Sequence, residues 1–153
     1  MGLDMYFNAK RYVSEYSEPE IQSKIKEICP GFTDSWKPNE ITYQVGYWRK
    51  FNALHNWFVD NVQDGIDECQ ETYVSYEKIL ELYDILIRVK ENHSLAEELL
   101  PTSSGFFFGS TEFDEWYFEC LDYTIETLKP IVDAINDNVE FPFPYRFYYQ
   151  SSW

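Results

Sequence analysis

The chain has 153 residues, of which 44% are hydrophobic and 20% aromatic, so it can form one folded domain spanning residues 1–153. Its 27 acidic and 12 basic residues give a net charge of −15, which disfavours direct binding to nucleic-acid backbones and to anionic membranes. No run approaches the roughly 20 apolar residues that would span a bilayer.

The first predicted elements are a strand and a helix. Residues 3–13 are rich in β-forming side chains and predict a strand. Ser17 and Glu20 have the spacing of a capping box, which predicts that a helix begins after Ser17. Pro30 and Gly31 predict its end. The apolar stripe of this helix comprises Ile21, Ile25 and Ile28.

The middle of the chain continues the alternation of strands and helices. Residues 41–48 predict a second strand, residues 49–62 a helix, and residues 71–74 a short strand. Gly65 is expected to close that helix. The predicted buried face of the helix comprises Phe51, Leu54, His55, Phe58 and Val62.

Two further helices are predicted after residue 74. Ser75 is the predicted cap of the longer one. Ser94 and Glu97 form another capping box, for a short helix that stops before Pro101. The apolar face of the longer helix comprises Ile79, Leu82, Leu86 and Val89.

The last part of the chain predicts a loop, a long helix and a strand. Thr111 is the predicted cap of a helix over residues 112–136, in which Pro130 should cause a kink or a restart. Residues 141–153 predict an edge or closing strand, because their prolines stand at the start. The predicted inner face of the long helix comprises Phe113, Tyr117, Leu121, Leu128, Ile131 and Ile135.

These elements together predict the fold class. Strands at the start, middle and end of the chain, with helices between them, predict an α+β domain: a small mixed or antiparallel sheet with about four helices packed on it. Cys29, Cys69 and Cys120 are far apart and odd in number, which predicts buried, reduced thiols in a cytoplasmic protein. We expect no cofactor.

Part of the chain matches the EF-hand calcium loop, but the match is incomplete. Val62 stands at loop position three without a ligand oxygen, and Asp67 replaces the apolar residue of position eight. No partner hand is found in the sequence. We therefore predict a helix end and a solvated turn, and no metal site. The matching residues, at positions one, five, six and twelve, are Asp60, Asp64, Gly65 and Glu71.

His55 stands in the middle of an apolar helical face, and Trp48 lies on the same side. A histidine there can act as a general base, but no serine or cysteine nucleophile with a recognisable motif accompanies it. His93 lies in a polar turn, so the sequence does not indicate a two-histidine zinc site. Two interpretations remain: a hydrogen-bonded structural histidine, or a pocket around Trp48, His55 and Trp57.

Three consecutive aromatic residues, Phe106, Phe107 and Phe108, lie between Gly105 and Gly109. They cannot all face one side of a strand, so at least one must point away from its neighbours. The ordinary interpretation is a buried strand that closes the core. The functional interpretation is an aromatic anchor at a binding surface.

The predicted last helix carries acidic residues at successive or near-successive turns of one face. The ordinary interpretation is a solvated face, and the functional one is a surface that imitates nucleic acid. The stripe extends over roughly 33 Å with one carboxylate per ~5.5 Å, against about one charge per 1.7 Å in duplex DNA, so other acids would have to contribute. The stripe comprises Glu115, Glu119, Asp122, Glu126, Asp133 and Asp137.

Four stretches of the chain are specific enough to compare with known families. They are MGLDMY at the start, YWRKFNALHNWFVDNVQDGIDECQ, ELLPTSSGFFFGSTEFDEWYFE, and YYQSSW at the end. Through them nearly the whole chain resembles a family of short phage and prophage proteins. The resemblance implies a phage or mobile-element gene and a bacterial cytoplasm, but no activity and no catalytic residue. Small acidic phage proteins include inhibitors of host defence. An inhibitory role for this chain is therefore expected by analogy only.

The leading functional hypothesis is a non-enzymatic, phage-encoded accessory protein that binds a host protein with a basic surface. The host protein would be a nucleic-acid-binding defence nuclease, inhibited in the manner of an anti-CRISPR protein or a DNA mimic. The acidic stripe and Phe106, Phe107 and Phe108 would bind it, and the protein would be a monomer or a homodimer. The alternative is a small-molecule-binding or enzymatic domain with a pocket around Trp48, His55 and Trp57.

Overall fold

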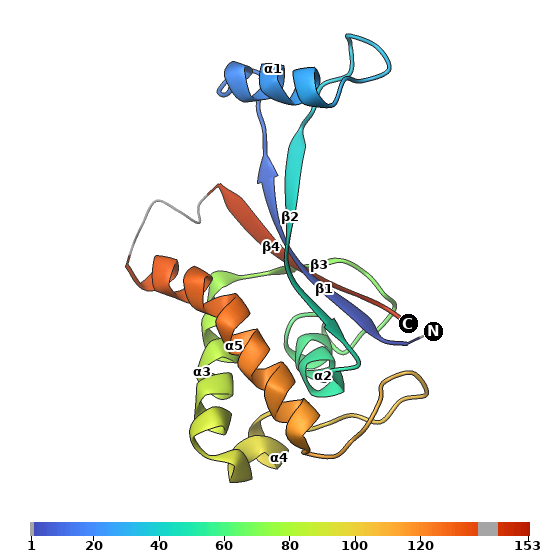
Figure 1. Ribbon diagram of the computed structural model, residues 1–153, viewed down its shortest axis with the longest axis vertical. Helices are drawn as coiled ribbons and strands as arrows, with labels where there is room; N and C mark the ends of the chain where they lie inside the picture. The colour runs from blue at the N-terminus through green and yellow to red at the C-terminus, as the bar shows by residue number, and fades with distance from the viewer. Residues whose placement is uncertain (1, 138–143) are drawn as a thin grey trace.

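The structure, a computed structural model, describes residues 2–137 and 144–153, whose strands form one four-stranded antiparallel sheet (Figure 1). The α+β prediction is confirmed, and every strand pair is antiparallel. The sheet has the order β2-β1-β4-β3. Its strands are β1 (Asp4–Tyr12), β2 (Glu40–Arg49), β3 (Thr72–Val74) and β4 (Tyr145–Ser152).

The position of β4 corrects the prediction of an edge strand at the C-terminal end. β4 pairs with β1 on one side and with β3 on the other, so it is an interior strand. Phe147 and Tyr149 alternate onto the buried face of the sheet, which favours an interior position. Residues 141–143 of the predicted strand lie outside the described residues.

Five α-helices and one short 3-10 helix connect these strands within the described ranges. In those ranges no helix combines the length and the apolar character that crossing a bilayer requires. The helices are α1 (Pro19–Ile28), α2 (Asn52–Asn61), α3 (Tyr76–Glu91), α4 (Ala96–Leu99) and α5 (Glu115–Asn136), and the 3-10 helix (His93–Leu95) precedes α4.

The helix starts confirm one predicted cap and correct three. Ser75 caps α3, and its side chain accepts a hydrogen bond from the Lys78 N–H at 3.3 Å. The start of α1 is not capped by Ser17: Glu18 precedes the helix, and Pro19 occupies the first turn, which its fixed φ favours. Asp114, rather than Thr111, caps α5 through the N–H of Tyr117.

The short helical segment and the proline in α5 also differ from the predictions. Asn92, rather than Ser94, accepts the capping hydrogen bond before the 3-10 helix. α5 continues through Pro130 and does not restart there. Pro130 is exposed, so water can satisfy the carbonyl group that the missing N–H leaves free. Phe113 precedes the helix and packs on Tyr117 from outside it.

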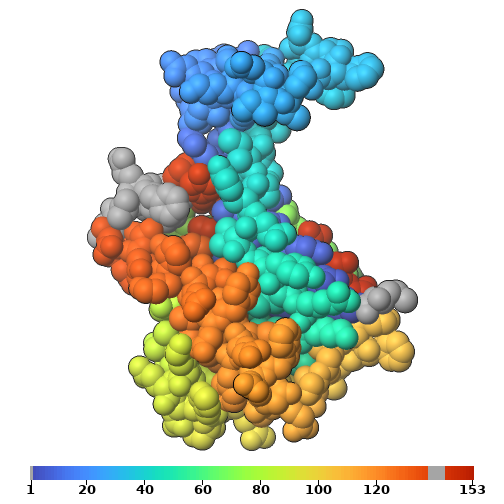
Figure 2. Space-filling model, in the orientation of Figure 1, coloured from blue at the N-terminus to red at the C-terminus, as the bar shows by residue number. Residues whose placement is uncertain are grey.

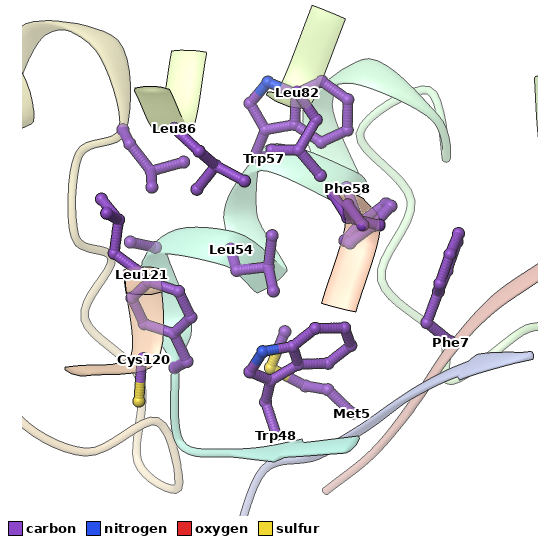
Figure 3. Packing of buried hydrophobic residues seen from close by; sticks show 14 of the residues in the cluster. Met5, Phe7, Trp48, Leu54, Trp57, Phe58, Leu82, Leu86, Cys120 and Leu121 are labelled. Carbon is purple, nitrogen blue, oxygen red and sulfur yellow. The ribbon is translucent and has the colours of Figure 1, made fainter. Parts of the chain in front are cut away.

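The core lies between one face of the sheet and helices α2, α3 and α5 (Figure 3). Phe58 of α2 stacks on Tyr149 with 4.0 Å between ring centroids and lies 6.1 Å from Phe7. The Trp48 indole N–H donates to the Thr124 hydroxyl at 2.9 Å, which ties β2 to α5. The predicted buried face of α2 is confirmed at Phe51, Leu54, His55 and Phe58, whereas Val62 is half-buried at the helix end.

Residues 14–39 form a unit that we call the head, which stands on the far end of the β1–β2 hairpin, apart from the other helices (Figures 1 and 2). Its helix, α1, does not pack on the sheet, contrary to the expectation of helices packed there. Ile28, at the end of its apolar stripe, is 84% exposed. The buried Gln22 amide fastens α1 to the hairpin by donating to the carbonyls of Val13 at 3.2 Å and Pro38 at 2.6 Å.

Candidate functional site

The acidic stripe lies on the exposed face of α5, and all six of its carboxylate residues are exposed. Two of them are already paired, because Asp122 accepts from Lys90 and Asp133 from Lys129, both at 2.7 Å. Among the described residues, no ion pair involves the other stripe members. The stripe is therefore sparser in free charge than the sequence suggests.

Two apolar depressions lie along the seam between α5 and β2, and each is bordered by an unpaired glutamate of the stripe. The first, of about 480 Å³, has Val45, Ile131 and Phe147 in its lining and Glu126 at its border. The second, of about 340 Å³, has Glu119 and Arg49 in its lining together with aromatic residues, including Trp116. We call this seam the α5–β2 groove. Its mainly apolar lining, with the unpaired carboxylates of Glu119 and Glu126, suits a basic, amphipathic protein segment.

The run of three phenylalanines is a turn and not the buried strand of the ordinary interpretation. The Phe108 N–H donates to the Gly105 carbonyl at 3.2 Å, and a Cβ added at Gly105 would lie 2.5 Å from the Phe108 ring. Phe107 and Phe108 are half-buried, whereas Phe106 is 95% exposed. Only Phe106 thus presents most of its ring to solvent.

His55 is 1% exposed and lies in a closed hydrogen-bond network. Its Nδ1 lies 2.7 Å from the Tyr149 hydroxyl, and its Nε2 lies 3.0 Å from a carboxylate oxygen of Asp67. The Trp153 indole N–H donates to the other oxygen of Asp67 at 3.1 Å. Burial raises the pKa of Tyr149 well above its ordinary value, so this phenol stays protonated.

The geometry around His55 agrees with the interpretation of a structural histidine. Both ring nitrogens are occupied within the protein, so His55 presents no free nitrogen to a ligand. The edge of the Phe108 ring packs against the imidazole at 5.0 Å between centroids. Trp48 and Trp57 are buried in the core, where Trp57 packs on Phe58. The three residues of the alternative pocket thus fill the interior.

The region around His55, in α2, brings together segments that lie far apart in the chain, and the start of β1 and the end of β4 lie near α2 (Figure 1). The Asn52 side chain, at the start of α2, donates to the carbonyls of Phe108 at 3.0 Å and Ser110 at 2.7 Å. The Leu3 N–H donates to the Phe107 carbonyl at 3.1 Å. These backbone and side-chain bonds hold the loop of residues 101–114 against α2 and β1.

Sequence reasoning missed Asn52, Asp67 and Tyr149 as partners in this region. Tyr149 is 94 residues from His55 along the chain, and Asn52 is 56 residues from Phe108. No local pattern indicates such pairs. The one available signal was the placement of His55 on an apolar face, where a buried imidazole must find polar partners.

A cavity of about 720 Å³ lies at the root of the head, between the residues that precede α1 and the strands of the sheet. Lys10, Arg11 and Arg146 contribute three of the twelve basic residues of the chain to its lining. Arg11 forms an ion pair with Glu18, and Lys10 bonds Glu71 at 2.7 Å. These contacts neutralise two of the three cations within the protein.

The segment that partly matches a calcium loop has its end residues in other contacts. Asp60 accepts a hydrogen bond from Asn56 at 3.1 Å, and Glu71 bonds Lys10. Within residues 2–137 and 144–153, no three His, Cys, Asp or Glu side chains gather in a way that could hold a metal ion. The prediction of buried cysteines is confirmed for Cys120, but Cys69 is only half-buried and Cys29 is exposed in the head.

Comparison with known proteins gives no match: no family model, no curated protein and no solved structure is similar to this chain.

Proposed function

We propose that the protein acts by binding a protein partner with a basic, amphipathic segment in the α5–β2 groove. The observation that carries this proposal is the pairing of apolar depressions with the unpaired carboxylates of Glu119 and Glu126. Apolar pockets supply most of the affinity of a protein interface, and charges at the border supply orientation and a faster association.

The apolar floor matters because the charge of α5 alone is insufficient. With Asp122 and Asp133 in internal ion pairs, the free carboxylates are more widely spaced than the phosphates of a nucleic acid. A pure imitation of DNA would therefore be weak. A mixed surface of charge and apolar area favours a protein segment over a simple cation.

We infer the kind of partner from the charge of the protein and from the resemblance to phage and prophage proteins that its sequence suggests. A net charge of −15 favours a host protein with a basic surface, and nucleic-acid-binding nucleases have such surfaces. The proposal in its finer form is a phage-encoded, cytoplasmic, anti-defence inhibitor of a bacterial nuclease. Phe106 would be an accessory contact on the neighbouring loop.

The alternative of a small-molecule or enzymatic pocket around Trp48, His55 and Trp57 has less support. A general base needs a free nitrogen within reach of a substrate, and both nitrogens of His55 have protein partners. An enzymatic role for His55 would require the Asp67 contact to open.

Affinity capture from a bacterial host extract, with quantitative mass spectrometry, tests the proposal. The groove variant, Glu119→Lys with Glu126→Lys, changes the charge at both depressions and leaves the Asp122 ion pair intact. The control variant, Glu91→Lys with Glu98→Lys, makes the same change in net charge at exposed positions of α3 and α4. Lysine is a good helix former, so both variants should fold.

We expect the wild type and the control variant to capture the same basic protein. The groove variant should recover it at least about tenfold less efficiently, because like charges now border the groove. Equal recovery by all three proteins at low salt would contradict binding in the groove. Capture of no protein by the wild type would remove the support for a host partner.

A further inference from the structure

The head presents an apolar surface at its outer end, which we call the apolar tip. Phe32 is 90% exposed and Trp36 60% exposed, and their ring centroids lie 6.2 Å apart. Ile28, at the adjoining end of α1, has most of its side chain in solvent. Three large apolar side chains on one projecting unit are unusual for a surface with no partner.

The apolar tip is held by internal contacts. The Lys26 ammonium donates to the Asp34 carbonyl at 3.1 Å, which ties the loop back to α1. The Trp36 N–H donates to the Thr33 carbonyl at 3.1 Å. A Cβ added at Gly31 would lie 2.8 Å from the Trp36 Cβ, so the loop is closely packed beside the indole. The rings are therefore presented in a defined arrangement, which lowers the entropy cost of covering them.

The head also differs from the rest of the molecule in charge. Residues 14–39 contain five acidic and three basic residues, a net of −2, which leaves −13 of the total of −15 for the remaining residues. A basic partner is therefore attracted mainly to the body, which carries most of the negative charge. The apolar tip suits a partner surface that is itself apolar and nearly uncharged. The tip of a second copy of this chain is such a surface.

We propose that the apolar tip is a self-association surface, and that two copies of this chain form a dimer through their heads. A symmetric contact would place Ile28, Phe32 and Trp36 of one copy against the same residues of the other. The head carries only −2 of the total charge of −15, so a contact between two heads brings little of that charge together. Because the head projects from the hairpin (Figure 2), this contact keeps the two acidic bodies apart, which weakens the screened repulsion between them.

The salt dependence of the dimer follows from this arrangement. Salt screens the residual repulsion between the copies and strengthens the apolar contact, so the dimer should become tighter as the salt concentration rises. The dimer would also leave both α5–β2 grooves free, one on each body. The inference stands independently of the function proposed for that groove.

Sedimentation equilibrium of the full chain, between about 1 µM and 500 µM, tests the dimer. The head variant is Ile28→Ser with Phe32→Ser. The matched control, Ile66→Ser with Phe106→Ser, removes the same two side-chain types from exposed positions on the body. All four positions are exposed, so each variant should retain the circular dichroism spectrum of the wild type.

The wild type and the matched control should reach twice the chain mass of 18.4 kDa, with dissociation constants within about threefold of each other. The head variant should dissociate with a constant at least about 100-fold higher, because it loses two apolar anchors from each copy. If the wild type keeps the mass of one chain over the whole concentration range, the proposal is overturned. The apolar tip would then have to bind a different protein. Equal dimerisation by the head variant, or equal loss in the matched control, also overturns it, because the contact then lies elsewhere.

Discussion

Two regions of this molecule, the surroundings of His55 and the head, differ in whether their large side chains are buried or exposed. Around His55, the rings of Phe58 and Tyr149 are buried, and Tyr149 and Asp67 satisfy both nitrogens of the imidazole. In the head, Phe32 and Ile28 lie in solvent, and the main buried polar contact is the Gln22 amide that fastens α1 to the hairpin. The region around His55 is a packed interior with its polar groups satisfied, and the head has an exposed apolar surface that a protein partner could cover.

This comparison shows where binding should be sought. A closed network stabilises the fold but offers nothing to a ligand, whereas exposed apolar area and unpaired charge gain free energy only when a partner covers them. The apolar tip and the α5–β2 groove have those properties. Substitutions around His55 should therefore lower the free energy of unfolding more than substitutions in the head.

The largest expected difference is between a core ring and an exposed ring. Phe58→Ala should lower the free energy of unfolding by about 3–5 kcal/mol, because it removes the ring stacked on Tyr149 and leaves a cavity. Tyr16→Ala, at the 94% exposed start of the head, should change it by less than about 0.5 kcal/mol. Urea denaturation at equal protein concentrations measures both. Similar losses for the two variants would contradict the comparison.

The second-largest difference is expected between the two histidines, in what each contributes to the free energy of unfolding. His55→Ala should cost about 2–4 kcal/mol, because it leaves the buried Tyr149 hydroxyl and one oxygen of Asp67 without their partner. His93 is exposed and stacks on Phe118, so His93→Ala should cost less than about 1 kcal/mol. Thermal and urea unfolding of both variants would reveal the difference. A stable His55→Ala variant would show that the network contributes little.

The buried thiol of Cys120 should make the stability of the fold depend on pH. Burial raises the pKa of Cys120 to about 12, so the folded protein keeps this proton while the unfolded chain loses it above a pH of about 8.5. The contribution of this thiol is therefore complete below pH 8.5 and is lost as the pH rises towards 12. Between pH 8 and pH 10 the wild type should lose on the order of 1–2 kcal/mol more stability than Cys120→Ala. An equal loss in Cys120→Ala would contradict this origin of the pH dependence.

The sequence predicted elements whose signals are local. Ser75 as a cap and the apolar face of α2 depend on residues within a few positions of one another, and both are confirmed. The Ser17 and Glu20 pair shows the limit of such patterns, because Pro19 competes for the helix start and determines it.

Features that depend on distant partners could not be predicted in the same way. The spacing of Ile21, Ile25 and Ile28 indicates an apolar side of α1, but not whether any element covers it. The interior position of β4 and the bond between His55 and Tyr149 depend on pairings across most of the chain. The stripe on α5 was found from helical spacing, whereas its apolar border with β2 depends on how the helix packs.

The most direct test of the central claim, that a basic partner binds in the α5–β2 groove, is the salt dependence of that binding. Calorimetry should compare the wild type, the groove variant, the control variant and the head variant with the captured protein between about 50 mM and 500 mM salt. For the wild type, the control variant and the head variant, the dissociation constant should rise steeply with salt, by about tenfold or more. The groove variant should bind weakly with a flatter dependence. A salt-independent affinity of the wild type, or the same steep dependence in the groove variant, would contradict the account.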